Sequence, residues 1–536
     1  MLALVAGLAL LAAAAFALTR LTDPTPTVAL GAPTFVDQTA SSGLNHIYDG
    51  DFAYAVGGGV AILDCDGSGK PAVYLAGGAN PAALYRDDTP VGGDLKFTRI
   101  ADPTTDLIGV LGAYPLDFDG DGITDLVVLR KGQSLVLGGL GDCRFAPGTP
   151  LGSANDWTTA FSATWESSNS LPTLALGHYL QLDASGQPDP SYSCADNLVY
   201  RPSSNGTGYA PPIDLAPGYC SLSMLFSDWD RSGRRDLRVT NDRQYYVGGQ
   251  DQLWRMAAGQ PPRLYTDADG WVNLQIWGMG IASFDVSGKG YPDVFLTSQG
   301  DNKLQTLAVG PGQPTYRDTA LRRGVTAAQP FAGGDVRPST AWHPQFEDIN
   351  NDGFIDLFVS KGNVSSQPDF ASRDPSNLFL GHPDGTFTEA AEAAGILNFD
   401  RGRGAALADF AMDGHLDLVE MNYGGQVRVW RNLGVSGGSA NWLGIRAEQP
   451  GRNRDAIGAW LEVQVGKTAL RRELTVGGGH AGGQLGWTHF GLGPAADVQV
   501  RVLWPDGDVG AWQTVRANQF ITIERGQSQP RVWIRP

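Results

Sequence analysis

The segment from residue 116 to residue 128 reads LDFDGDGITDLVV, and this stretch indicates the fold class of the chain. Its central nine residues, Asp117–Asp125, carry carboxylates at the first, third, fifth and ninth positions and a glycine at the sixth. Apolar runs lie on both sides. Two apolar runs joined by an Asp-Gly turn predict a β-hairpin whose turn is rich in carboxylates.

The same nine-residue pattern returns along the chain, and we number its copies loop one to loop seven. Loop two is the stretch quoted above, and loop six lies in residues 347–359, which read EDINNDGFIDLFV. Weaker copies, which are loops one, four, five and seven, begin at Asp64, Asp228, Asp285 and Asp409. A faint loop three lies between Thr164 and Leu176. Copies about 50 to 65 residues apart, each with several short apolar runs, predict the blades of a seven-bladed β-propeller.

A second motif has an aromatic residue, an acid two positions later and a glycine eight positions after the aromatic. Its copies are Phe35–Gly43, Tyr316–Gly324 and Phe387–Gly395. The first copy precedes loop one, and no copy follows loop seven. We therefore expect the strand near Phe35 to complete the last blade and close the ring.

The pattern changes near residue 440. Alternating runs at residues 460–465 and 498–504 predict strands of a small separate β domain, and a Gly- and Ser-rich stretch precedes them. The predicted fold class is all-β, a seven-bladed propeller followed by a small β-rich C-terminal domain. The predicted parts are a propeller at 33–433, a linker at 434–440, a β domain at 441–526 and a tail at 527–536.

The first 22 residues are apolar up to Leu18, and Arg20 carries the first charge. This length suits an export signal, and residues 15–17 offer an A-x-A cleavage site. A positive segment is missing, so residues 1–22 are either a cleaved signal peptide or a retained membrane anchor, followed by a linker at 23–32. Either way we expect an exported protein that is extracellular, periplasmic or at the cell surface.

Acidic residues number 56 and basic residues 39, so the formal net charge is −17. This balance argues against nucleic acid and anionic membrane surfaces as partners and fits cation binding. The many aromatic residues, 21 Phe, 16 Tyr and 14 Trp, argue against a disordered acidic chain.

Four cysteines permit two disulfides in an exported chain, with three connectivities. We expect Cys194 and Cys220 to pair. Cys65 and Cys143 pair only if blades 1 and 2 bring their Cα atoms within about 7 Å. If the chain is not exported, all four are expected to be buried free thiols.

The acidic loops have the chemistry of calcium sites. Ca²⁺ takes six to eight oxygen ligands, which such a loop supplies from positions 1, 3, 5 and 9 and from the carbonyl of position 7. An EF-hand would have Glu at position 12 and then a helix, but this position holds Val128 in loop two and Val359 in loop six. The alternative is that Asp and Gly serve only as turn residues.

We predict two to four Ca²⁺ ions, first in loops two and six, then in loop four, and in loop seven, where Ala411 removes one ligand. The predicted ligands are Asp117, Asp119, Asp121, Ile123 and Asp125 in loop two; Asp348, Asn350, Asp352, Phe354 and Asp356 in loop six; Asp228, Asp230, Ser232, Arg234 and Asp236 in loop four; and Asp409, Asp413, His415 and Asp417 in loop seven. Loop one has Ala72 at position 9. In loop five Lys289 stands at position 5, where its ammonium either replaces the metal or points into solvent.

These residues resemble the FG-GAP/VCBS propeller family, which includes integrin α-subunit heads, and most closely its cartilage acidic protein branch with a C-terminal ASPIC/UnbV domain. The motifs that resemble this domain are residues 453–459 (NRDAIGA), 476–479 (VGGG), 489–493 (HFGLG) and 504–507 (WPDG). The resemblance implies an extracellular protein with Ca²⁺ in its blade loops and adhesion or matrix interaction. It does not imply a reaction.

The function predicted from the sequence is therefore a binding, adhesion or scaffold protein, not an enzyme, with a protein or glycan ligand at the cell surface or envelope. One alternative is a polysaccharide lyase or other carbohydrate-active enzyme on a propeller, with Arg337, His343 and Tyr423 as candidate groups. Another is a structural part of a larger envelope assembly. A G-x-G-x-x-G match at Gly477, Gly479 and Gly482 lacks the βαβ context of a dinucleotide site, and we take it as chance.

Overall fold

The computed structural model describes residues 28–206, 208–242, 249–326, 340–364, 374–438 and 440–534. The predicted signal or anchor at 1–22 lies outside them. Nearly all regular structure is strand, with two single-turn helices, α3 (Ala320–Arg323) and α4 (Ala391–Ala394), and two 3-10 turns, η1 (Phe52–Tyr54) and η2 (Asp267–Asp269). Among these residues, no helix has the length and apolar character needed to cross a membrane.

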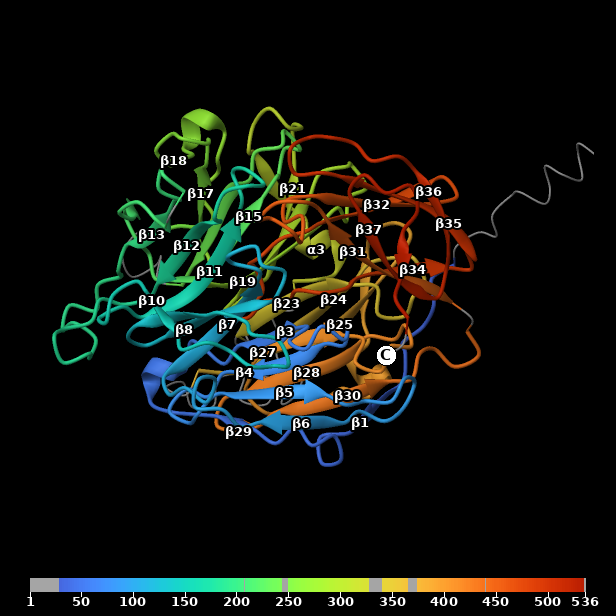
Figure 1. The fold of residues 1–536 in the computed structure, drawn as a ribbon, viewed down its shortest axis with the longest axis horizontal. Coiled ribbons are helices and arrows are strands. Elements are labelled where there is room, and N and C mark those ends of the chain that lie inside the picture. The colour runs from blue at the N-terminus through green and yellow to red at the C-terminus, as the bar shows by residue number, and fades with distance from the viewer. Residues whose placement is uncertain are drawn as a thin grey trace, which may run out of the picture.

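Seven four-stranded antiparallel sheets form the blades of a propeller (Figure 1). Blade 1 contains β3 (Val60–Leu63), β4 (Ala72–Leu75), β5 (Ala83–Asp87) and β6 (Phe97–Ile100). Blade 2 contains β7 (Val110–Leu116), β8 (Asp125–Arg130), β9 (Ser134–Leu137) and β10 (Thr149–Leu151). Blade 3 contains β11 (Thr158–Thr164), β12 (Thr173–His178), β13 (Asn197–Tyr200) and β14 (Ile213–Leu215). Blade 4 contains β15 (Ser221–Ser227), β16 (Asp236–Asn241), β17 (Gln252–Arg255) and β18 (Arg263–Leu264). Blade 5 contains β19 (Gly278–Phe284), β20 (Asp293–Ser298), β21 (Lys303–Leu307) and β22 (Tyr316–Asp318). Blade 6 contains β23 (Ala341–Glu347), β24 (Asp356–Lys361), β25 (Asn377–Gly381) and β26 (Phe387–Glu389).

Blade 7 closes the ring with a strand from the start of the chain. It contains β27 (Gly402–Ala408), β28 (Asp417–Asn422), β30 (Arg428–Asn432) and the N-terminal β1 (Phe35–Asp37). Phe35 lies opposite Asn432 in the antiparallel register, so the predicted closure by the strand near Phe35 is confirmed. A small ribbon of β2 (Ile47–Tyr48) and β29 (Gly425–Gln426) adds to the same junction.

The second sequence motif forms the outer edge of three blades. Its aromatic residue and acid lie in the outermost strand, and in blades 5 and 6 the next residues form α3 and α4. The glycine then adopts a left-handed conformation, with φ of 83–84° at Gly43, Gly324 and Gly395. This backbone conformation explains why the position is glycine, since side chains disfavour it.

The C-terminal domain is a sandwich of two four-stranded sheets around its own apolar core. One sheet has the order β34-β31-β37-β38 and the other β33-β32-β35-β36. Their bounds are β31 (Asn441–Glu448), β32 (Trp460–Val465), β33 (Thr468–Glu473), β34 (Thr488–Gly493), β35 (Asp497–Leu503), β36 (Gln513–Arg516), β37 (Gln519–Glu524) and β38 (Arg531–Val532).

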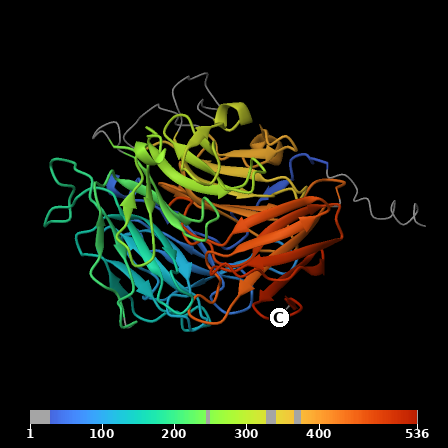
Figure 2. The ribbon, with the colours of Figure 1, turned by 90° about the horizontal axis from the view of Figure 1, so that it is seen from above.

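One sequence prediction about this domain needs correction. The predicted tail at 527–536 contains β38, which pairs with β37, and the indole Nε1 of Trp533 donates to the carbonyl of Ser68, at 2.9 Å. A two-residue strand is too short to give a periodic signal, so the sequence did not reveal it. The domain has its own sheets and core, and it packs against the propeller, as Figure 2 shows for its red strands.

Both disulfides join neighbouring blades. Cys194 and Cys220 link blade 3 to the start of blade 4, which confirms the predicted pair, with Cα atoms 4.9 Å apart. Cys65 in loop one and Cys143 in blade 2 also pair. Their Cα atoms lie 4.5 Å apart, within the limit of about 7 Å that a disulfide requires.

Candidate metal loops beneath the C-terminal domain

All six recognisable acidic loops connect the first and second strands of a blade and fold into the same turn. In each, the carboxylate at position 1 accepts a hydrogen bond of 2.6–3.0 Å from the backbone N–H of the glycine at position 6. These glycines are Gly69, Gly122, Gly233, Gly290, Gly353 and Gly414, all with φ between 83° and 89°. The predicted role of this glycine in the bend is confirmed.

Loop two brings its carboxylates to one point. One oxygen from each of Asp117, Asp119 and Asp125 lies within 4.8 Å of the other two. Asp125 also accepts backbone hydrogen bonds from Phe118 (2.6 Å) and Gly139 (2.7 Å), which fix it against the loop. Burial raises the pKa of Asp125 to about 7, and the nearby Asp119 and Asp117 add to the effect. The carboxylates of this cluster therefore repel one another, and burial adds to the free-energy cost of their charged forms.

Loop six repeats these bonds and is more deeply buried. Asp348, Asn350, Asp352 and Asp356 are each at most 5% exposed. Asp356 accepts from the backbone N–H of Ile349 at 2.9 Å, as Asp125 does from Phe118. Burial and mutual repulsion raise the pKa values of Asp348 and Asp356 well above the ordinary Asp value. Among the described residues, no ion pair reaches a carboxylate at the predicted ligand positions of loop two or loop six; the one nearby pair joins Arg472 to Glu347, which precedes loop six.

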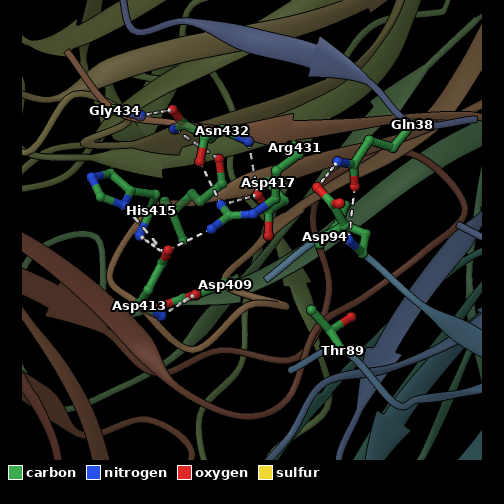
Figure 3. A network of polar contacts seen from close by, with 12 residues as sticks. Gln38, Thr89, Asp94, Asp409, Asp413, His415, Asp417, Arg431, Asn432 and Gly434 are labelled. Carbon is green, nitrogen blue, oxygen red and sulfur yellow. Dashed lines mark hydrogen bonds and ion pairs between the residues drawn. The ribbon is translucent and has the colours of Figure 1, made fainter. Parts of the chain in front are cut away.

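Loops four and seven hold a guanidinium among their carboxylates. In loop four the Nε of Arg234 lies 2.8 Å from Asp236, and its Nη2 lies 3.4 Å from Asp230. In loop seven the guanidinium of Arg431, from β30, pairs with Asp417 at 2.8 Å and also with Asp413 (Figure 3). Both arginines supply positive charge where a metal would supply it, which disfavours the predicted Ca²⁺ in these loops.

The predicted position-7 residues of these loops act through their side chains. Arg234 is the cation of loop four, and His415 Nδ1 lies 3.3 Å from Asp413 in loop seven. From the sequence, Arg234 and His415 were each predicted to offer only a backbone carbonyl as a Ca²⁺ ligand. Sequence reasoning missed Arg431, because that residue lies in another strand and belongs to no motif.

Loops one and five also have cationic neighbours. Arg446 of the C-terminal domain pairs with Asp64 of loop one at 3.1 Å. The ammonium of Lys289 in loop five donates to the carbonyl of Leu307, at 3.1 Å, and the backbone N–H of Lys289 donates to Asp285, at 2.9 Å. The ammonium of this exposed residue thus bonds a backbone carbonyl rather than the carboxylates of its own loop.

The motifs that marked the C-terminal domain in the sequence are its contacts with the acidic loops. His489 Nε2 lies 2.6 Å from Asn351 Oδ1 of loop six. The carbonyl of Pro505 accepts from Arg235 of loop four, at 3.0 Å. The backbone N–H of Asn453 donates to the carbonyl of Ser168, at 3.0 Å, in the connection that replaces loop three. Each motif thus has a structural role in docking.

Residues 476–485, which read VGGGHAGGQL, form a channel segment that enters the centre of the ring. Its backbone forms bridges with the innermost strands of blades 1 to 5, at Gln484–Ile62, Gly482–Ala113, Val476–Ala163, Gly477–Leu225 and Gly479–Ile281. In blade 6, His343 Nδ1 accepts from the backbone N–H of His480 at 3.1 Å. A Cβ on Gly482 would lie 2.1 Å from the carbonyl oxygen of Val60, so close backbone contact explains the glycine pattern here.

A cavity of about 510 Å³ lies between the loop face of the propeller and the C-terminal domain. Carboxylates from both sides line it: Asp64, Asp66, Asp117, Asp285, Glu347 and Asp409 from the propeller, and Glu448, Asp455 and Glu473 from the C-terminal domain. Four arginines also line it: Arg446, Arg454, Arg471 and Arg472. Burial and then the charge of Asp117 raise the pKa of Asp455 to about 6.

The candidate lyase residues do not form a site in the described structure. His343 is buried against the channel segment, whereas the Tyr423 hydroxyl donates to the carbonyls of Gly50 and Asp51, at 2.8 and 3.2 Å. Arg337 lies outside the described residues. No contact joins His343 to Tyr423 among the hydrogen bonds and ring contacts of the described residues.

Comparison with known proteins finds two family models in the chain. The ASPIC and UnbV model matches residues 449–530, and the FG-GAP-like repeat model matches residues 348–420, which span loops six and seven. Cartilage acidic protein 1 of Homo sapiens is 26% identical over 227 residues, which are 40% of this chain and 32% of that protein. The Xenopus tropicalis protein of the same name is 26% identical over 229 residues, and the match covers 33% of its length.

Solved structures overlap the chain more loosely. A crystal structure of BBS1N in complex with ARL6DN covers 76% of this chain and 98% of that chain, at 10% identity and a TM-score of 0.43. An Agrocybe aegerita lectin with specific recognition of non-reducing terminal N-acetylglucosamine covers 75% of this chain and 90% of that chain, at 16% identity and a TM-score of 0.29.

The sheets and the family matches agree on the parts of the molecule. The FG-GAP-like match covers the acidic loops of blades 6 and 7, and the ASPIC and UnbV match covers most of the sandwich. The chain therefore has the fold of a seven-bladed β-propeller with a C-terminal β-sandwich; residues 348–420 match the FG-GAP-like repeat model, residues 449–530 match the ASPIC and UnbV model, and 40% of the chain is similar to cartilage acidic protein 1.

Proposed function

We propose that this protein is an exported calcium-binding propeller that acts as a binding or scaffold protein, with Ca²⁺ in loops two and six. One observation carries the calcium assignment. Loop six buries its carboxylates, and loop two gathers those of Asp117, Asp119 and Asp125, of which Asp119 is exposed. Neither set has an ion-pair partner among the described residues, whereas loops four and seven contain a guanidinium. Buried carboxylates need a compensating charge, and oxygen-rich loops of this kind suit Ca²⁺.

Other features support export and a binding role. Two disulfides fit an oxidising compartment outside the cytosol. The C-terminal domain covers the loop face, which leaves the opposite face of the ring for a protein or glycan ligand. Apolar side chains are exposed on that face at Ile47, Phe52 and Ile108, which are 44–48% exposed. No reaction is proposed; of the candidate catalytic residues, the two that the structure describes, His343 and Tyr423, make no contact with each other.

The calcium assignment is tested by counting bound ions. We expect calorimetric titration of the metal-free protein with Ca²⁺ to give two ions, at the lower end of the two to four predicted from the sequence. Asp125→Asn should remove the ion of loop two, and Asp356→Asn should remove that of loop six. Saturating Ca²⁺ at a hundredfold excess over Kd should stabilise the fold by about 2.7 kcal/mol for each site.

Two variants serve as controls. Asp236→Asn changes the same loop position in loop four, where Arg234 already supplies the charge, so the ion count should stay at two. Asp301→Asn changes an exposed carboxylate away from the loops. If the wild-type protein takes up no Ca²⁺ and chelation leaves its melting temperature unchanged, the assignment is wrong.

A further inference from the structure

Three guanidinium groups converge on one carboxylate where the C-terminal domain meets loop four. The carboxylate belongs to Glu462 of β32, which is only 3% exposed. Its Oε1 lies 2.7 Å from Arg471 Nε and 3.5 Å from Arg231 Nη2. Its Oε2 lies 2.6 Å from Arg501 Nη2. Because the three arginines contact the same carboxylate, their positive charges lie close together.

The register of the sheet fixes two of these arginines. Glu462 lies opposite Arg471 of β33 and opposite Arg501 of β35, so the three side chains leave the same face of the sheet. This is the outer face, because Leu461 and Val463, on either side of Glu462, belong to the apolar core of the sandwich. The third guanidinium comes from loop four of the propeller, so both domains form the cluster.

The nearby carboxylates do not neutralise the three arginines. Burial raises the pKa of Asp285 of loop five, and the charge of Arg471 is among the effects that lower it, so Asp285 also acts on this cluster. Counting Glu462 and Asp285 against three guanidinium groups leaves one positive charge in excess, in a chain whose formal net charge is −17. Positive charges this close repel one another, and a bound anion would relieve the repulsion.

A second observation is that donors in and beside this cluster lack acceptors. The ring of Trp460 lies 4.7 Å from Arg231 Cζ and is 6% exposed, and its buried Nε1 has no hydrogen-bond partner in the described protein. Among the described residues, Arg471 forms a hydrogen bond only through Nε, so its two Nη groups have none. Trp460 and Arg471 both line the cavity between the domains. Donors without acceptors favour an occupant rich in acceptor oxygens.

We propose that this arginine cluster, which consists of Arg231, Arg471, Arg501 and Trp460, binds a sulfate or phosphate group. Guanidinium groups offer paired N–H donors that match the oxygens of such anions. The three arginines come from two strands and a loop, so they suit a tetrahedral anion, whose oxygens point in several directions. Their side chains are 19–28% exposed, so a small anionic group can reach them from solvent. The site goes beyond the proposed calcium sites and does not depend on them, because its groups are donors.

The test is calorimetric titration of the full chain with sodium sulfate and, separately, with sodium phosphate, in a calcium-free buffer of low ionic strength. We expect a saturable site that Arg471→Gln weakens at least tenfold, while Arg471→Lys, which keeps the charge but loses the paired donors, falls between. Glu462→Gln removes the negative charge that opposes the anion and should bind more tightly than the wild-type protein, which a purely structural cluster would not do. Arg516→Gln, at an exposed arginine of β36, is the matched control and should bind like the wild-type protein.

A third titration shows whether the group is carried by a larger ligand. The probe is a disaccharide with one O-sulfate group. If it binds at least tenfold more tightly than inorganic sulfate, the site recognises a sulfated glycan; equal affinities identify the anion itself as the ligand. If none of the three probes binds, or if Arg471→Gln binds like the wild-type protein, the proposal is wrong. The calcium titrations test loops two and six separately, so either proposal can fail while the other stands.

Discussion

At the scale of single residues, one acidic turn occurs in two forms. The carboxylates at the predicted ligand positions of loops two and six have no ion pair among the described residues, whereas Arg234 and Arg431 pair with those of loops four and seven. The first arginine lies inside its loop and could be noticed in the sequence. The second lies 14 residues after Asp417 in another strand, and only the fold brings it to the loop.

One residue-scale prediction concerns Glu473, whose carboxylate accepts from the Asp228 backbone N–H and the Ser227 hydroxyl. Burial and the charge of Asp228 raise the pKa of Glu473 to about 8, from an ordinary value of 4.5. The folded chain therefore keeps this proton up to about pH 8, while the unfolded chain loses it near pH 4.5. Between these values the folded state binds more protons, so its stability falls as the pH rises.

Glu473→Gln should remove this loss, because an amide, like the protonated acid, carries no charge to be buried. We expect the variant to melt at a higher temperature than the wild-type protein at pH 8 and at a similar temperature at pH 4.5. Thermal unfolding in the presence of a chelator measures both. A variant less stable at pH 8 would contradict the raised pKa, and Glu392→Gln, at an exposed position, is the control.

At the scale of elements, the channel segment determines how the two domains fit together. Small residues let backbones approach at the ring centre on both sides of the contact. A Cβ on Gly112 of β7 would lie 1.7 Å from the carbonyl oxygen of Ala481, and a Cβ on Gly59 would lie 1.9 Å from it. The backbone of the inner strands thus lies in direct contact with the backbone of the channel segment, with no room for side chains between them.

Gly482→Ala should therefore be costly. The added methyl group would overlap the carbonyl of Val60, and strain of this kind costs about 1–3 kcal/mol. We expect a lower melting temperature and faster amide exchange in residues 476–485. Gly312→Ala, where a Cβ meets nothing within 4 Å, is the matched control and should change stability little. If Gly482→Ala and Gly312→Ala had the same melting temperature, the channel segment would not be packed closely against the inner strands.

The sequence predicts the elements better than their assembly. The nine-residue loops and the aromatic motif indicated seven blades and the strand that closes the ring, because each blade repeats the same local pattern. The docking of the C-terminal domain gave no such signal, since the contacts of His489, Pro505 and Asn453 occur once each. The channel glycines matched an unrelated motif, and only the structure shows the backbone contacts that require them.

At the scale of the whole molecule, covalent links join blades in pairs. Cys65–Cys143 links blades 1 and 2, and Cys194–Cys220 links blades 3 and 4. Because they span separations of 78 and 26 residues, both bonds restrict the unfolded chain considerably.

Removing either disulfide should destabilise the protein by about 2–4 kcal/mol. Paired replacements, Cys65→Ser with Cys143→Ser and Cys194→Ser with Cys220→Ala, should each lower the melting temperature, and a reductant should lower that of the wild-type protein. Peptide mapping without reduction checks the pairing itself. Free thiols at these positions in the purified exported protein would contradict it.

The closing strand has a consequence for how the protein is made. β1 leaves the ribosome before the other strands of the propeller, but its partner β30 is synthesised about 400 residues later, which takes roughly 20 to 80 seconds at ordinary rates of synthesis. Until then the nascent ring has two unpaired strand edges, which are prone to aggregate. The channel segment emerges later still. We therefore expect the ring of a ribosome-bound chain to stay open at blade 7 until β30 is made. A chaperone that covers strand edges should reduce aggregation most during this interval.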